Sequence, residues 1–136
     1  MKKTLLICLV LVFSCSSIEQ KAVFQKIKYK AMTRGYSTEI VLQDDTLKYF
    51  KNTKENRSIR LTEELKDSLN NVIKKINLKT INQLKAPSNK FQFDGAMYTT
   101  IEIILNGKTY ISSGFDHDNP PKELTPFINF LLTLIK

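Results

Sequence analysis

The sequence has no hydrophobic run long enough to cross a membrane. Its longest unbroken apolar stretch, residues 5–13, has nine residues. A helix rises about 1.5 Å per residue, whereas the hydrocarbon core of a bilayer is roughly 30 Å thick. We therefore exclude a permanent transmembrane helix in this stretch and interpret it as an export signal.

Residues that carry metal or nucleophilic chemistry are also scarce. The chain has one histidine, His117, and two cysteines, with no HxH, HExxH or CxxC pattern. A zinc site would need mostly carboxylate ligands, which suit calcium or magnesium better. A GxSxG elbow is absent, and the four glycines stand singly rather than in a phosphate-binding loop. We therefore expect no metal and no cofactor, and the sequence favours a protein that is not an enzyme.

The N-terminus does contain a recognisable pattern. Lys2 and Lys3 precede the apolar stretch, and small residues surround Cys15. This order is typical of a secretory signal. Residues 12–17 (VFSCSS) also resemble the lipobox of bacterial lipoproteins, and the whole chain is similar to small uncharacterised lipoproteins of Bacteroidota. The resemblance implies cleavage before Cys15 and a lipid, such as palmitate, on that residue.

The resemblance also implies an organisation and a location. We expect a lipoprotein signal peptide at residues 1–14, a lipidated tether at 15–22 and a single domain at 23–136. The protein would then be held to the cell envelope by its lipid, and we expect it at the outer membrane. The alternative is cleavage after Ser16 by the ordinary signal peptidase, which would release a soluble protein. Because Cys8 leaves with the signal peptide, a chain starting at Cys15 would have no free thiol and no disulfide.

The net charge of the chain indicates what class of partner it could bind. The formal net charge is +8, or +6 without Lys2 and Lys3. A moderately basic surface attracts phosphate groups, nucleic acid or acidic polysaccharide. An exported protein rarely meets nucleic acid, so we expect an envelope protein or an anionic glycan or lipid instead.

The apolar pattern predicts the fold. Residues 62–77 and 125–136 have apolar residues at helical spacing, and residues 52–60 read as a polar loop. Five segments alternate apolar and polar residues as strands do, the last two around an Asn106-Gly107 hairpin turn. These segments are residues 23–32, 36–42, 47–51, 97–105 and 108–113. The order βββ-α-ββ-α predicts an α+β fold, with an antiparallel sheet of about five strands and the helices on one face.

One polar stretch near the C-terminus is the candidate site. Asp116, His117 and Asp118 are consecutive, and Asp94 would join them if its turn lay at the same sheet edge. Such a cluster supports a metal-binding protein or a hydrolase-like enzyme as the alternative. Neighbours in an extended segment point in opposite directions, however, so these three cannot easily converge on one metal. The other interpretation is a corner in which Asp118 or Asn119 caps a turn and Thr125 opens the last helix.

Two further features could bind a partner. Lys26, Lys28 and Lys30 lie on one side of the first strand, as an anion-binding surface or as a solvated face that discourages aggregation. Of Phe91 and Phe93, one would be an exposed recognition anchor if its segment is a loop. We therefore predict a lipid-anchored envelope protein that acts as a binding or interaction domain. An inhibitor or immunity protein for an envelope enzyme is a further hypothesis.

Overall fold

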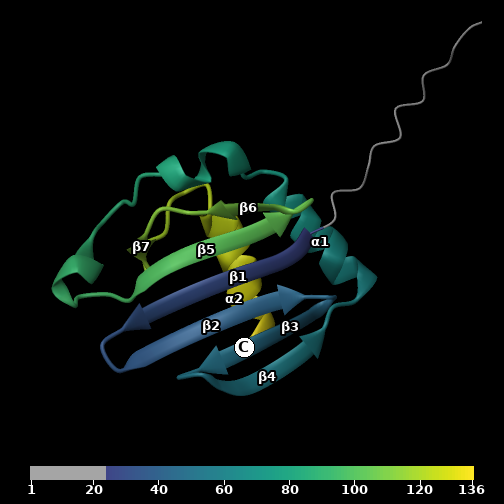
Figure 1. The fold of residues 1–136 in the computed structure, drawn as a ribbon, viewed down its shortest axis with the longest axis horizontal. Coiled ribbons are helices and arrows are strands. Elements are labelled where there is room, and N and C mark those ends of the chain that lie inside the picture. The colour runs from purple at the N-terminus through teal and green to yellow at the C-terminus, as the bar shows by residue number, and fades with distance from the viewer. Residues whose placement is uncertain (1–23) are drawn as a thin grey trace, which may run out of the picture.

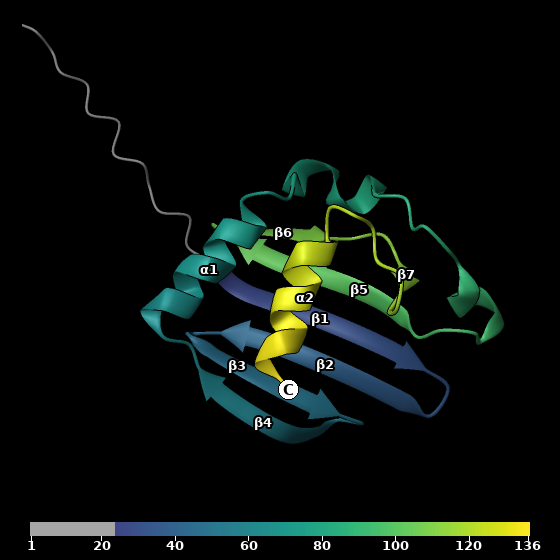
Figure 2. The ribbon, with the colours of Figure 1, turned by 180° about the vertical axis from the view of Figure 1, so that it is seen from behind.

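The computed structural model describes residues 24–136, which form one antiparallel sheet with two α-helices on one of its faces. Figure 1 looks onto the sheet with the helices behind it, and Figure 2 shows the same molecule with the helices in front. This is the α+β class that the sequence predicts. The segments predicted as signal peptide (1–14) and tether (15–22), with Cys15, lie outside the described residues.

The sheet has seven strands rather than about five. Its order is β4-β3-β2-β1-β5-β6. Strand β7 pairs with the first residues of β5, whereas β6 pairs with the last ones. Every pairing is antiparallel. The strands are β1 (Phe24–Thr33), β2 (Tyr36–Gln43), β3 (Thr46–Lys51), β4 (Lys54–Arg60), β5 (Tyr98–Leu105), β6 (Lys108–Ile111) and β7 (Phe115–Asp116).

The prediction of a loop at residues 52–60 is wrong, because most of it forms strand β4 at the edge of the sheet. All residues of β4 are exposed except Ile59, which is half-buried. The strand therefore has no apolar alternation, and its pairing with β3 rests on backbone hydrogen bonds. Asn52 and Thr53 make the turn with positive φ values of 47° and 67°. Charged side chains of this kind are common on edge strands, where they discourage pairing with another chain.

Helix α1 (Glu63–Ile73) begins where the sequence predicts. Thr62 is its N-cap, and the Thr62 hydroxyl accepts a hydrogen bond from the Leu65 N–H at 3.3 Å. The helix ends earlier than predicted, so Lys74 and the next lysine follow the helix instead of lying in its last turn. Two short 3-10 helices, η1 (Leu78–Gln83) and η2 (Lys90–Phe93), then lead to β5.

Helix α2 (Thr125–Leu134) lies across the sheet beside α1, as Figure 2 shows. Its N-cap is Leu124 and not Thr125, whose hydroxyl donates to the Pro121 carbonyl oxygen at 3.1 Å. Phe127, Ile128 and Leu131 are buried. No helix within residues 24–136 is long and apolar enough to span a bilayer.

The β5–β6 hairpin is confirmed. Asn106 and Gly107 form its turn with φ values of 50° and 75°, the left-handed conformation that such turns require. The core fills the space between the sheet and the two helices. Its sheet residues are Ile27, Tyr29, Ala31, Ile40, Leu42, Leu47, Ile101, Ile103 and Phe115.

Candidate functional site

Asp116 is the centre of the predicted polar corner. Its side chain forms hydrogen bonds with a loop that lies far away in the sequence. The residue is 0% exposed. Its carboxylate accepts hydrogen bonds from the Ser88 hydroxyl at 2.6 Å, the Lys90 N–H at 2.9 Å and the Phe91 N–H at 2.8 Å. These three donors fasten η2 and the residues before it to the edge of the sheet formed by β7.

The same contacts control the charge of Asp116. Burial alone would raise the pKa of its carboxyl, but the hydrogen bonds from Ser88, Phe91 and Lys90 and the positive charge of Lys90 outweigh burial. The pKa therefore lies below its ordinary value. A carboxylate that stays ionised in this way is a permanent acceptor, not a proton donor.

Ser88 and His117 are not coupled as a nucleophile and its base. The Ser88 hydroxyl donates to Asp116 and accepts from the Asn119 side-chain amide at 2.8 Å. Nδ1 of His117 accepts a hydrogen bond from the Met97 N–H at 3.2 Å, and the His117 N–H donates to the Met97 carbonyl oxygen at 3.1 Å. Both candidate groups are thus engaged in holding the corner and the loop together.

The other predicted residues of the polar site are peripheral. The Asp118 carboxylate pairs with Nζ of Lys90 at 3.3 Å, and Asp94 is exposed with φ of 57°, where it ends η2. Within residues 24–136, no group of three or more histidine, cysteine, aspartate or glutamate side chains could hold a metal ion. The structure does bring η2 and the corner together, but through Asp116. The side chains of Asp118 and Asn119 bind Lys90 and Ser88 instead of capping the following turn, as the sequence had suggested.

The face of the sheet opposite the helices is the second candidate, and we call it the open face. No helix among residues 24–136 covers it (Figure 1). Strand register places the three predicted lysines on it, since Lys28 lies opposite Val41 and Glu102 and Lys30 lies opposite Glu39 and Thr100. The open face consists of Lys26, Lys28, Lys30 and Met32 on β1, Ser37, Glu39 and Val41 on β2, Lys48 and Phe50 on β3, Tyr98, Thr100, Glu102 and Ile104 on β5, and Ile111 on β6.

The charges on the open face are only partly balanced. Lys28 pairs with Glu39 at 3.1 Å, and Lys48 pairs with Glu55 at 3.2 Å. Lys26 and Lys30 form no ion pair with any described residue. On the β3–β4 hairpin, strand register places Lys48 and Arg60 on this face together with the single acid Glu55. The surface therefore favours a negatively charged partner.

Two neighbouring hollows lie at the end of the sheet where β1 turns into β2. One of about 290 Å³ is lined by Lys30, Ser37, Glu39, Phe50 and Thr53. The other, about 390 Å³, is lined by Met32, Thr33, Gly35, Tyr36, Ser37, Asn52 and Thr53. They share Ser37 and Thr53, so they adjoin each other, and unpaired Lys30 lines the first of them.

An aromatic cluster continues the open face on the other side of β1. Met32 lies opposite Tyr98, and these residues are 42% and 39% exposed. The rings of Tyr98 and Phe91 meet edge to face, with centroids 5.0 Å apart. Phe93, on the same short helix as Phe91, is 79% exposed. Of the two phenylalanines, Phe93 is therefore the exposed one.

Gly114 gives the Tyr98 ring its position. A Cβ at this residue would lie 2.0 Å from Cε2 of Tyr98, so the ring packs directly on the backbone there. We expect Gly114→Ala to push the ring toward solvent and destabilise the fold by about 1 kcal/mol, at the low end for overpacking because the ring can swing outward. In a Tyr98→Ala background the same change should cost almost nothing. A double-mutant cycle of thermal melts measures this, and an equal cost in both backgrounds would refute the contact.

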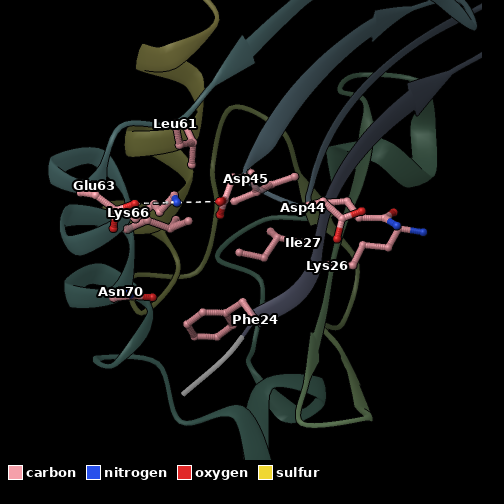
Figure 3. Close-up of a pocket in the computed structure, with 12 residues that line it drawn as sticks. Phe24, Lys26, Ile27, Asp44, Asp45, Leu61, Glu63, Lys66 and Asn70 are labelled. Atoms are coloured by element: carbon pink, nitrogen blue, oxygen red, sulfur yellow. Dashed lines mark hydrogen bonds and ion pairs between the residues drawn. The ribbon is translucent and has the colours of Figure 1, made fainter. Parts of the chain in front are cut away.

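A smaller pocket of about 200 Å³ separates α1 from the β2–β3 turn (Figure 3). Nζ of Lys66 lies 2.6 Å from the Asp45 carboxylate and 2.9 Å from that of Glu63. Hydrogen bonds to these two carboxylates raise the pKa of Lys66. Ligand sites commonly start at roughly 300 Å³. We interpret the charged trio as a fastening between α1 and the turn rather than as a ligand site.

Sequence reasoning alone missed the hollows and the pairing of Met32 with Tyr98. The alternation of buried and outward residues along β5 does place Tyr98 on the side away from the core. Which strand lies beside β5 depends on the whole sheet. Comparison with known proteins adds no further lead, since no protein-family model, curated protein or solved structure matches the chain.

Proposed function

We propose that this protein is a lipid-anchored domain of the bacterial cell envelope that binds an acidic glycan and catalyses no reaction. The observation that carries the proposal is the open face, where unpaired Lys30 borders a depression in an otherwise flat sheet. The anchor is the lipid expected on Cys15. The proposal accounts for the basic charge of the exported part of the chain.

The chemistry of the surface favours a glycan over other anionic partners. The two hollows, about 290 and 390 Å³, are close in size to small-ligand sites. A sugar unit can enter such a hollow, whereas the surface of a bilayer cannot. A protein partner would call for an apolar centre ringed by polar groups. The open face instead mixes lysine, glutamate, serine and isolated apolar side chains.

The absence of catalysis is supported by the state of the polar corner. The Asp116 carboxylate accepts three hydrogen bonds, the Ser88 hydroxyl donates one of them, and the Nδ1 atom of His117 accepts a hydrogen bond from a backbone N–H. Each group that could act as nucleophile, base or acid is committed to holding the loop.

The test uses the full chain in uncharged detergent, with polygalacturonate as the acidic glycan and dextran as the neutral one. We expect binding to polygalacturonate only. Lys26→Glu/Lys30→Glu should lower the affinity about tenfold or more and weaken its salt dependence, because it removes two attractive charges and adds two repulsive ones.

The matched control is Lys74→Glu/Lys75→Glu, which changes the net charge equally at exposed positions just beyond α1. It should bind nearly as well as the wild type. Equal losses of affinity for polygalacturonate in both variants would reveal non-specific charge attraction and contradict the proposal. Binding to anionic vesicles but not to polygalacturonate would replace the glycan with a lipid surface.

A further inference from the structure

The geometry points to an extended acidic glycan that crosses the strands and stacks a sugar ring on Phe93 and Tyr98; this inference rests on the proposed function. Strand register gives a continuous path. Ser37 lies opposite Met32, and Met32 lies opposite Tyr98, so one row of residues leads from the hollows across β2, β1 and β5 to Tyr98. The Tyr98 ring meets Phe91 on η2, the short helix that also carries Phe93.

Phe93 is exposed, yet it stands on a well-fastened segment. The Asp116 carboxylate binds the N–H groups of Lys90 and Phe91, the first two residues of η2. Leaving a phenylalanine 79% exposed forgoes the stabilisation that its burial would give. A rigidly held, exposed aromatic side chain is typical of a binding anchor, because little conformational entropy is lost when it meets its partner.

The groups around the aromatic rings fit a sugar. The C–H face of a pyranose packs on an aromatic ring, and its hydroxyls need hydrogen-bonding partners nearby. Exposed Asn89, Gln92 and Asp94 supply such partners on and beside η2. Lys30 and Arg34 flank Met32 along β1 and its turn, and neither is ion-paired with a described residue, so both are available to uronate carboxylates.

A protein partner fits less well. Among residues 24–136, the exposed large hydrophobic residues are Met32, Phe93, Tyr98 and Ile111. Ile111 lies apart from the others on β6, where it pairs with Glu102. The other three residues expose too little apolar area to form the core of a stable protein interface.

The test measures binding of polygalacturonate to the full chain in uncharged detergent. Phe93→Ala should lower the affinity about tenfold while leaving the salt dependence unchanged, because stacking involves no charge. Phe93→Tyr should restore binding. Leu132→Ala is the control, since it removes a partly exposed apolar side chain from α2, on the other face of the sheet, and it should bind like the wild type.

The outcomes separate this inference from the proposed function. If Phe93→Ala binds like the wild type while Lys26→Glu/Lys30→Glu does not, the stacking inference is wrong and the proposed function stands. Equal losses of affinity in Phe93→Ala and Leu132→Ala would also overturn stacking, since the effect would then be general. If the wild type does not bind polygalacturonate, both fail. Thermal melts of each variant exclude a loss through unfolding.

Discussion

Replacing Asp116 with alanine should release the loop of residues 88–91 from the edge of the sheet. Two backbone N–H groups and the Ser88 hydroxyl lose a buried acceptor at once. We expect amide hydrogen exchange at Lys90 and Phe91 to accelerate about tenfold or more, while the strands keep their protection. Asp94→Asn is the control, because Asp94 is exposed, its side chain makes no hydrogen bond or ion pair with a described residue, and asparagine tolerates its positive φ.

The same loop should loosen in acid. Because the folded-state pKa of Asp116 is lowered, its stabilising contribution is complete above the unfolded-state value of about 4. The contribution is lost as the pH falls from there through the folded-state pKa. Protection factors at Lys90 and Phe91 should therefore be level between about pH 7 and 5 and fall in stronger acid. In Asp116→Asn this fall in protection should be absent. If the protection factors of that variant still fall in acid, another group causes the change.

Cys15→Ala should move nearly all of the protein from the membrane to the soluble fraction. The variant keeps the apolar export signal but has no thiol to acylate, and stable attachment of the expected kind depends on acyl chains buried in the bilayer. Fractionation of cells and incorporation of labelled palmitate measure the effect.

The chain offers its own control for this experiment. Cys8→Ala removes the other cysteine, which lies within the predicted signal peptide, and should leave both membrane attachment and labelling unchanged. Membrane attachment of Cys15→Ala, together with a wild type that incorporates no palmitate, would contradict the anchor.

Features with a local cause could be predicted from the sequence. The Asn106-Gly107 turn and the Thr62 N-cap depend on the chemistry of one or two residues, and both are present. Strand β4 could not be predicted, because its charged residues show no apolar period and it is held to β3 by backbone pairing and one exposed ion pair, Lys48–Glu55. The third predicted local feature, a cap at Thr125, is wrong because the turn after Pro121 already leads into α2 from Leu124.

The candidate sites were harder to predict than these local features, because they depend on tertiary structure. The sequence indicates that Asp116 lies at a corner, but the donors it binds come from residues 25 to 28 positions earlier, which no local pattern connects to it. The outward direction of Lys26, Lys28 and Lys30 follows from alternation alone. Which of them remain unpaired depends on Glu39, which reaches Lys28 from the neighbouring strand.

Nuclear magnetic resonance of the isotope-labelled full chain in uncharged detergent tests the central claim, that the open face is the binding surface. Addition of oligogalacturonate should shift the resonances of Lys30, Met32, Tyr98 and Phe93 and leave those of α1 and α2 in place. Shifts confined to the helices or to the pocket around Lys66, with none on the open face, would contradict the account.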